Sequence, residues 1–184
     1  MARERLAGML LVATPVMRDP NFDHTVVLLL DHNDDGALGV VLNRPSGATV
    51  AGPLPAWMDR AAPPPVVFIG GPVSPGSAIC LARSGASGGD GWQPLFAGLG
   101  TVDLARGPEE LGAAIEAVRV FAGYAGWGAG QLESEIEAGA WFVLPTKPGD
   151  ALGDDPEGLW REVLRRQGGV VAAMATFPSE LSVN

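Results

Sequence analysis

The sequence predicts an α+β fold in a single domain that spans residues 1–184. Three observations lead to this class. A chain of 184 residues suits one domain with a sizeable core. Its 26 glycines and 16 prolines favour turns and short strands over long helices. Apolar runs of strand length outnumber the segments with helical spacing, and several of them are joined by short polar loops, as in hairpins.

The first expected element is a core strand over Met9–Ala13. The chain before it superficially resembles a signal peptide, because Arg3 and Arg5 precede an apolar run. However, Glu4 interrupts the positive start, Pro15 interrupts the run, and no clean small-residue cleavage site follows. We therefore expect a strand of the folded protein at this position.

Two hairpins are expected in the next part of the chain. Thr25–Leu30 is a continuous apolar run, which predicts a strand buried on both faces. The polar loop Asp31–Gly36 joins it to a second strand, Ala37–Leu42, to make the first hairpin. Val66–Ile69 is again strand-like, and Ala78–Ala82 is its expected partner in the second hairpin.

The segments around the second hairpin carry weaker signals. Residues 46–65 contain five prolines and are expected to wrap the surface, with a helical turn at Ala56–Arg60. Ser84–Gly91 is a loop of glycine and serine. Leu99–Val102 is a weak candidate for a further strand.

A helix is expected to begin at Gly107–Glu110, where proline takes the first position and carboxylates lie near the positive end of the helix dipole. Leu111, Ile115 and Val118 recur at helical spacing, which predicts one buried face. The apolar residues 118–121 then predict a strand.

The last part of the chain predicts four elements. Gln131–Glu137 is expected to form a short helix, and Ala140–Leu144 a strand. Asp155–Glu157 is expected to cap the last helix, which glycines 168 and 169 end. Val170–Thr176 is expected to supply a final strand.

The most unusual stretch is Phe121–Leu132. It holds Gly123, Gly126, Gly128 and Gly130 around the only tyrosine, Tyr124, and one of the five tryptophans, Trp127. Such glycine density indicates positive φ or close approach to the main chain. We expect a glycine-rich turn between a strand and a helix, a common place for a binding site. The alternative is a tightly packed turn, with Trp127 and Tyr124 covering the edge of the core.

A phosphate site in this stretch is disfavoured. Glu133, Glu135 and Glu137 already bring negative charge to the helix that follows. The glycine spacing is neither a dinucleotide fingerprint nor a P-loop. Only Arg44 or Arg119 folding over the turn would change this expectation.

Other motifs match catalytic or metal sites only in part. Asp31–Gly36 opens like an EF-hand loop, but Leu42 stands where a bidentate glutamate is required. Gly85–Gly89 fits the G-x-S-x-G pattern of serine hydrolases, yet both histidines precede it. Those histidines, His24 and His32, form no metal-ligand set and are expected on the surface, with a lone acid or base role as the alternative.

The composition limits the classes of function that the protein can have. A net charge of −9 with only 12 basic residues disfavours nucleic-acid binding. Cys80, the only cysteine, excludes an internal disulfide and is expected to be buried and inert. No apolar stretch is long enough to span a bilayer. We expect a cytoplasmic protein without cofactor or metal, which binds a protein partner or a small anionic ligand in an oligomeric state left open.

The candidate site groups three motifs at expected strand ends. They supply Asn43, Arg44, Gly70, Gly71, Gly126, Trp127, Gly128 and Gln131. Arg44 would bind an anion, Trp127 would offer a flat apolar face, and Gln131 would give directional hydrogen bonds. A structural Arg44 that bonds loop carbonyls is the alternative. Because no complete catalytic constellation accompanies these residues, we expect a non-catalytic binding or regulatory protein.

Two other functions stay open. One is an enzyme acting on a small anionic metabolite, with Arg44 positioning it and a carboxylate such as Glu133 as base. The other is direct transcriptional regulation, which the net charge of −9 disfavours.

Four ordered motifs give the chain a family resemblance. They are Asp19–Phe22, Gly36–Pro45, Gly70–Val73 and Gly123–Glu133, the last followed by Ala140 and Trp141. Together they resemble the YqgE/AlgH family of small bacterial proteins, which are sometimes labelled transcriptional regulators. The resemblance implies a mixed, largely antiparallel, partly barrel-like sheet flanked by short helices, and a cytosolic setting. The family often has a histidine where Ala82 stands here, so a role for that imidazole cannot operate in this chain.

Overall fold

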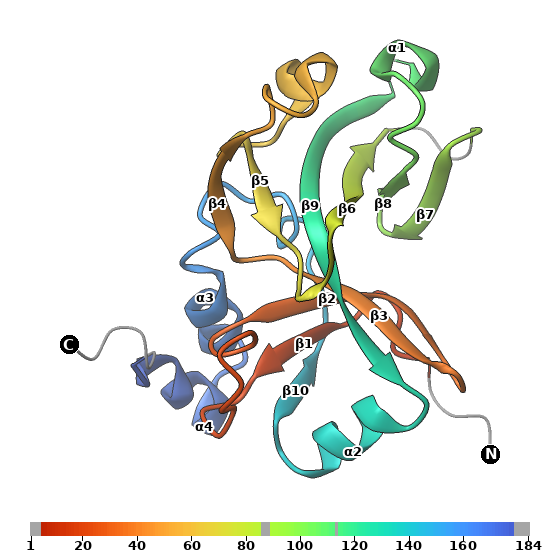
Figure 1. Ribbon diagram of the computed structural model, residues 1–184. Coiled ribbons are helices and arrows are strands. Elements are labelled where there is room, and N and C mark those ends of the chain that lie inside the picture. Colours follow the sequence, from red (N-terminus) through yellow and green to blue (C-terminus); the bar gives the residue numbers. More distant parts are fainter. Residues whose placement is uncertain (1–4, 86–88, 113, 179–184) are drawn as a thin grey trace.

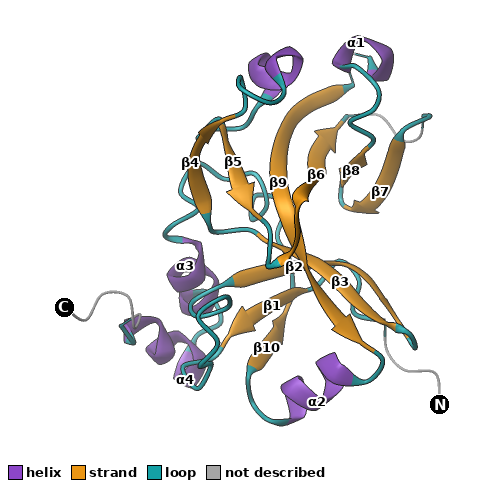
Figure 2. Ribbon diagram, in the orientation of Figure 1, coloured by secondary structure: helices purple, strands orange, loops and turns teal. Residues whose placement is uncertain are grey.

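The computed structural model describes residues 5–85, 89–112 and 114–178. Within these ranges ten strands form one curled sheet of half-barrel shape, with short helices at its periphery (Figure 1 and Figure 2). The expected α+β class, with one domain and a largely antiparallel, partly barrel-like sheet, is confirmed.

The elements have the following bounds. The strands are β1 Leu10–Ala13, β2 Val26–Asn33, β3 Gly36–Val41, β4 Pro45–Thr49, β5 Val66–Ile69, β6 Val73–Ser84, β7 Trp92–Phe96, β8 Leu99–Val102, β9 Ile115–Gly128 and β10 Trp141–Leu144. The helical elements are η1 Pro55–Arg60, α1 Pro108–Leu111, α2 Gln131–Glu137, α3 Leu159–Arg165, α4 Gly169–Ala173 and η2 Met174–Thr176, of which η1 and η2 are 3₁₀ helices.

The strand order is β10-β1-β2-β3-β9-β6-β8-β7. All these neighbours are antiparallel. β5 joins β9 in a parallel pairing and carries β4 antiparallel on its other side. The sheet is therefore mixed only at β9, the strand on which the other parts converge.

β9 is a strand of 14 residues that belongs to both halves of the sheet. Its first part pairs with β5 and β6, and its end pairs with β3. Figure 1 shows it running through the molecule from the end that carries α1 to the end that carries α2. At Gly123, φ is +72°, and here the pairing with β6 jumps from Ala122–Ala78 to Tyr124–Val73. This bend leads the strand from one half-sheet into the other.

Three apolar clusters fill the protein. The largest packs α3 against the sheet and includes Trp160 and Phe121. The second lies beneath α2 and includes Trp127 and Trp141. The third joins η1, through Trp57, to β6, β8 and β9. Burial of large apolar side chains, worth about 1.5–3 kcal/mol each, is the main favourable contribution to folding.

Most expected elements of the first half are confirmed. They include β1, the β2–β3 hairpin, the helical turn η1 and the weak candidate β8. The partner expected for Ala78–Ala82 was wrong. Ile69 and Ala78 both pair with Ala122, so β9 lies between β5 and β6 instead of letting them form a hairpin.

Two strands were not expected. β4 lies at the start of the proline-rich segment, and β7 follows the glycine and serine loop, of which residues 86–88 lie outside the described part of the chain. The Ser87 of the G-x-S-x-G match is among those residues. Both strands contain a proline, Pro45 or Pro94, and both lie at an edge of the sheet, where a missing N–H is tolerated.

The expected helix after Gly107 is one turn only. α1 has proline at its start, as expected, but Gly112 has φ +76° and turns the chain away. Ile115 and Val118 lie in β9, so the predicted helical face was wrong. Both residues are nevertheless buried in the third apolar cluster, with Leu111 packed against it, which is why their spacing suggested a common face.

Two further expectations are corrected near the C-terminus. The glycine-rich stretch continues as strand up to Gly128, so only Ala129 and Gly130 separate β9 from α2. Val170–Thr176 forms α4 and η2 instead of a strand. These elements pack against α3, and Val170 is 75% exposed, because local packing overrides the β-propensity of the segment.

Candidate functional site

Asn43 and Arg44 hold the loop that precedes β2. The Asn43 side chain accepts the main-chain N–H of Val26 at 3.0 Å and donates to the carbonyl of His24 at 2.8 Å. Arg44 donates to three loop carbonyls, those of Pro20, Asn21 and Asp23. These two sequence-predicted residues therefore determine the conformation of residues 20–24.

The environment of Arg44 fits this structural use. Burial lowers the pKa of its guanidinium, and the carboxylates of Asp23 and Asp19 partly offset that effect. Its donors point at carbonyls of the protein. Arg44 thus makes the contacts of the alternative raised from the sequence, in which it has a structural role and bonds loop carbonyls.

The loop presents a histidine in an unusual setting. His24 has φ +56°, a left-handed conformation that costs a non-glycine residue free energy. Its Nδ1 lies 2.8 Å from a carboxylate oxygen of Asp23, and its Nε2 lies 3.0 Å from the carbonyl oxygen of Phe177. The ring lies against Trp160 at a centroid distance of 4.0 Å. We call Asp23, His24, Trp160 and Phe177 the His24 cluster.

The Phe177 carbonyl fixes the role of Nε2 in the His24 ring. A carbonyl oxygen only accepts hydrogen bonds, so Nε2–H is the donor in this contact. Hydrogen bonds in which one partner is charged are about twice as strong as neutral ones. An anionic oxygen is therefore a better acceptor for Nε2–H than a carbonyl.

A hollow of about 220 Å³ adjoins the His24 cluster. It is lined by Pro15, Met17, Arg18, Asp23, His24, Phe177 and Pro178. The lining combines the Arg18 guanidinium and the Nε2–H of His24 with one carboxylate and an apolar wall. The arrangement suits a small ligand with an anionic oxygen and an apolar body.

The Gly70–Gly71 turn and Gly126 meet around Tyr124. A Cβ atom on Gly71 would lie 2.2 Å from the main chain of Tyr124, and one on Gly70 would lie 2.4 Å from the carbonyl oxygen of Gly123. The Gly126 position faces the Tyr124 ring, at 3.5 Å. Close approach of two main chains therefore explains Gly70 and Gly71. The same turn bonds to the strand before Asn43, since Val41 N–H donates to the Gly70 carbonyl at 2.8 Å.

Trp127, Gly128 and Gln131 belong to a different network. The indole N–H of Trp127 and that of Trp141 both donate to Glu135. Gln131 donates to the same carboxylate at 3.2 Å and accepts the main-chain N–H of Gly128 at 3.0 Å. Trp127 is only 6% exposed, so its ring packs in the core beneath α2. We call Trp127, Gln131, Glu135 and Trp141 the Glu135 cluster.

The predicted site residues thus fall into two places. Asn43, Arg44, Gly70 and Gly71 are joined by main-chain hydrogen bonds, with Gly126 nearby, whereas the Glu135 cluster lies at the end of β9 under α2. The sequence reasoning missed His24 as a site residue. The adjacent Asp23, directly before a buried strand, was the one available signal, since Trp160 and Phe177 come from distant parts of the chain.

The second histidine has a structural role. His32 is buried, which corrects the expectation of a surface position. Its Nδ1 accepts the main-chain N–H of Leu6 at 3.0 Å, and its Nε2 lies 2.8 Å from Glu133. This contact is near the end of β2 opposite to Arg44, so the acid–base pair considered from the sequence, Arg44 with Glu133, is not brought together.

Two other groups considered from the sequence are buried. Arg119 donates to the carbonyls of Pro63, Ala151 and Gly153 and lies 4.4 Å above the Phe68 ring, so it does not cover the glycine-rich stretch. Desolvation lowers its pKa to about 10. Burial raises the pKa of the Cys80 thiol to about 12, which makes it inert, as expected.

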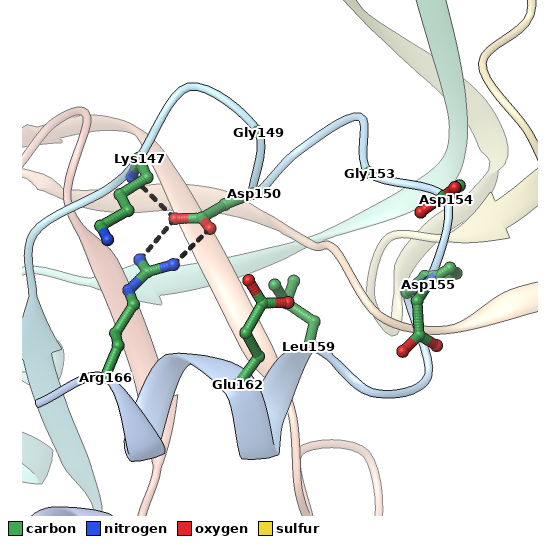
Figure 3. Close-up of a pocket in the computed structure, with 10 residues that line it drawn as sticks. Lys147, Gly149, Asp150, Gly153, Asp154, Asp155, Leu159, Glu162 and Arg166 are labelled. Atoms are coloured by element: carbon green, nitrogen blue, oxygen red, sulfur yellow. Dashed lines mark hydrogen bonds and ion pairs between the residues drawn. The ribbon is translucent and has the colours of Figure 1, made fainter.

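A second hollow, of about 300 Å³, lies between α3 and the loop before it (Figure 3). Asp150 accepts the main-chain N–H of Lys147 and two hydrogen bonds from Arg166, all at 2.7 Å. Hydrogen bonding to Asp150 raises the pKa of Arg166. Asp154, Asp155 and Glu162 add carboxylates to the lining. This hollow is acidic, and its strongest ion pair is already made within the protein.

A curled half-barrel sheet wound around one long strand, with peripheral short helices and a histidine-lined hollow, defines a small single-domain α+β protein. The chain belongs to the AlgH-like family, whose sequence profile matches residues 10–172. The resemblance inferred from the four motifs is therefore confirmed.

Relatives and solved structures agree with this membership. A UPF0301 protein of Streptomyces coelicolor is 54% identical over 184 residues, which cover 97% of this chain and 95% of the relative. The crystal structure of a Corynebacterium diphtheriae protein matches with a TM-score of 0.88 and 32% identity, covering 96% of this chain and 95% of that one. The solution structure of AlgH from Pseudomonas aeruginosa matches with a TM-score of 0.70 and 31% identity, covering 97% of both chains.

The helices of the described residues are all short. None of them has the length and apolar character needed to cross a bilayer. A spanning helix needs about 20 apolar residues.

Proposed function

We propose that this protein is a cytoplasmic, non-catalytic binding protein with a regulatory role, and that its ligand is a small anion held in the hollow beside His24. The observation that carries the proposal is the left-handed His24, fixed between Asp23 and the Phe177 carbonyl against Trp160. A residue kept in a costly conformation by its surroundings is a pointer to function. The lone, buried Cys80 suits the reducing cytoplasm.

The surroundings of His24 support an anionic ligand. The Nε2–H of His24, which donates to the Phe177 carbonyl, lies in a hollow that Arg18 also lines, and an anionic acceptor would strengthen its hydrogen bond. Asn43 and Arg44 fix the loop on which the histidine stands. Their part in binding is therefore to position His24, in place of the direct contact expected for Arg44 from the sequence.

The same lining favours binding over catalysis. The described residues around the hollow provide an acid, a histidine and a guanidinium, but among them no hydroxyl, thiol or amine side chain is present for covalent chemistry. Both nitrogens of the His24 ring already have partners within the protein, the Asp23 carboxylate and the Phe177 carbonyl.

The test is thermal unfolding with a panel of small carboxylates, inorganic phosphate, sugar phosphates and nucleotides. A ligand at one hundred times its dissociation constant stabilises the folded state by about 2.7 kcal/mol, which raises the midpoint measurably. His24→Asn should abolish the shift, because asparagine tolerates left-handed φ but carries no charge. Arg83→Ala, which removes a half-exposed cation in the other half of the sheet, should leave it unchanged.

The proposal fails on either of two results. One is that no compound of the panel shifts the midpoint of the wild-type protein. The other is that the shift persists undiminished in a folded His24→Asn variant.

A protein partner is the second candidate, and a specific observation favours it. Ile69 and Val73, 49% and 36% exposed, flank the Gly70–Gly71 turn beside Tyr124. Exposed apolar side chains gathered at one place are typical of interaction surfaces. Ile69→Lys would abolish capture of such a partner from lysate, whereas Val170→Lys, at another exposed apolar residue, would not.

A further inference from the structure

The chain covers the His24 cluster with its own C-terminal segment, residues 169–178. Within this segment only Ala175 is buried, while Val170 and Phe177 are 75% and 49% exposed. Val171 and Met174 pack partly against the main core. A segment with so little buried surface opens at low free-energy cost.

Two polar contacts fasten this segment. The Arg161 guanidinium donates to the carbonyl of Ala175, and Nε2–H of His24 donates to the carbonyl of Phe177. The Arg161 donor is charged, and both acceptors are neutral main-chain oxygens. The second contact lies in the hollow, so it occupies the donor that a ligand would need.

A carboxylate is a better acceptor for this donor than the Phe177 carbonyl. The Nε2–H donor gains more from an anionic oxygen than from a neutral one. Arg18 lines the same hollow and adds a second positive charge near the bound oxygen. Pro15 and Met17 supply an apolar wall that suits the carbon chain of a short aliphatic acid.

We infer that the hollow binds a small monocarboxylate whose oxygen replaces the Phe177 carbonyl on His24, and that the C-terminal segment is an internal competitor for the site. The inference rests on the proposed anion binding at His24 and adds the ligand class and its regulation. Ligand and segment exclude one another, so the bound state exposes residues 169–178 and the free state covers the donor.

A phosphate ligand fits this geometry less well. Phosphate presents several oxygen acceptors and carries nearly two charges, whereas the hollow is lined by one imidazole N–H donor, one guanidinium and the Asp23 carboxylate. Inorganic phosphate is therefore the comparison compound for the ligand class.

The experiment is a calorimetric titration of the full chain with butyrate and, separately, with inorganic phosphate. Arg161→Ala removes one of the two contacts that hold the segment, so butyrate should bind about ten- to a hundredfold more tightly than to wild type, the effect of one hydrogen bond to a charged group. Arg165→Ala, which removes an exposed charge from the same helix, should bind as wild type. His24→Asn should not bind.

A second variant releases the segment by another route. Ala175→Asp places a charge at the buried position of residues 169–178 and should raise butyrate affinity as Arg161→Ala does. In the wild type, the backbone amide resonances of residues 170–177 should shift when butyrate is added, as the segment leaves the cluster.

The outcomes distinguish competition by the C-terminal segment from anion binding at His24. Butyrate binding that is equal in wild type, Arg161→Ala and Ala175→Asp overturns the competition while anion binding at His24 stands. Binding of phosphate without butyrate overturns the ligand class. If no compound of the wider panel binds to any variant, the proposed function itself fails.

Discussion

Trp127 and Trp141, from β9 and β10, donate their indole N–H groups to the same atom, Oε2 of Glu135, at 2.8 and 3.0 Å. Both indoles are more than nine-tenths buried, so neither has access to bulk water as a replacement acceptor. One carboxylate of α2 thereby accepts a hydrogen bond from each of two strands, β9 and β10. These strands flank the three strands β1, β2 and β3 on opposite sides. The aromatic residue that stood out in the sequence is thus part of the attachment of α2.

Glu135→Ala should destabilise the protein by about 2–4 kcal/mol, because two buried N–H groups lose their acceptor. The free energy of unfolding in urea measures the change. Glu137→Ala, an exposed substitution on the same helix, is the control and should cost less than about 0.5 kcal/mol. Equal stability of the two variants would show that the shared carboxylate contributes nothing.

Gly123→Ala should destabilise by at least about 2 kcal/mol, since left-handed φ alone costs a side chain about 1–2 kcal/mol. Its Cβ would also lie 2.6 Å from the Gly71 oxygen. Gly126→Ala should be tolerated within about 1 kcal/mol, because the nearest atom is 3.5 Å away, in the Tyr124 ring. Urea unfolding compares the pair, and a neutral Gly123→Ala would contradict the bend assigned to that position.

Arg44→Lys should lower the stability by about 1–3 kcal/mol, because a single ammonium cannot replace a guanidinium that reaches three carbonyls. The loop of residues 20–24 should exchange its amide hydrogens faster. A direct role in anion binding predicts the opposite pattern, with ligand affinity lost and the free energy of unfolding unchanged. Arg106→Lys is the control for the general effect of replacing an arginine by a lysine.

Cys80 should resist thiol reagents in the native protein. Its pKa is raised from 9.0 to about 12, so at about pH 8 the thiolate is scarce even before burial limits access. Folding holds this proton more tightly than the unfolded chain does, so the group lowers stability as pH rises from 9.0 to about 12. Labelling in buffer and in denaturant measures this, and rapid modification without denaturant would contradict it.

The ring nitrogens of the two histidines should differ in their ¹⁵N chemical shifts. The Nε2 of His24 donates to the Phe177 carbonyl and should show the shift of a protonated nitrogen while the C-terminal segment is in place. His32 accepts the Leu6 N–H, so its Nδ1 should show the shift of a bare nitrogen. A bare Nε2 on His24 in the covered state would contradict the contact with Phe177.

The sequence predicted those elements whose signals are local. The β2–β3 hairpin follows from two apolar runs around a polar turn, and α2 begins at the expected Gln131. The strand expected from Val118 to Phe121 lies within β9, but the start of β9 was taken for helix, because Leu111, Ile115 and Val118 share one core although they come from two kinds of element. α4 escaped because Val170 and Val171 favour strands, while packing against α3 decides their conformation.

Of the candidate site, the sequence pointed only to the residues that hold the loop in place. Asn43 and Arg44 stood out at the end of an expected strand, and they hold the loop of the His24 cluster. The cluster itself joins His24 to Phe177, 153 positions further along the chain. No local pattern encodes that contact, because it depends on how α3 and the segment after it dock on the sheet.

The central place of β9 bears on how the protein forms during synthesis. Strands β2 and β3 on one side, and β5, β6 and β8 on the other, are synthesised before Ile115–Gly128. Until then they have no common neighbour, and their inner edges stay open to mispairing. We therefore expect a nascent chain that stays protease-sensitive, and dependent on chaperones, until roughly 30–40 residues beyond β9 have been translated, when the whole half-barrel closes in one late step.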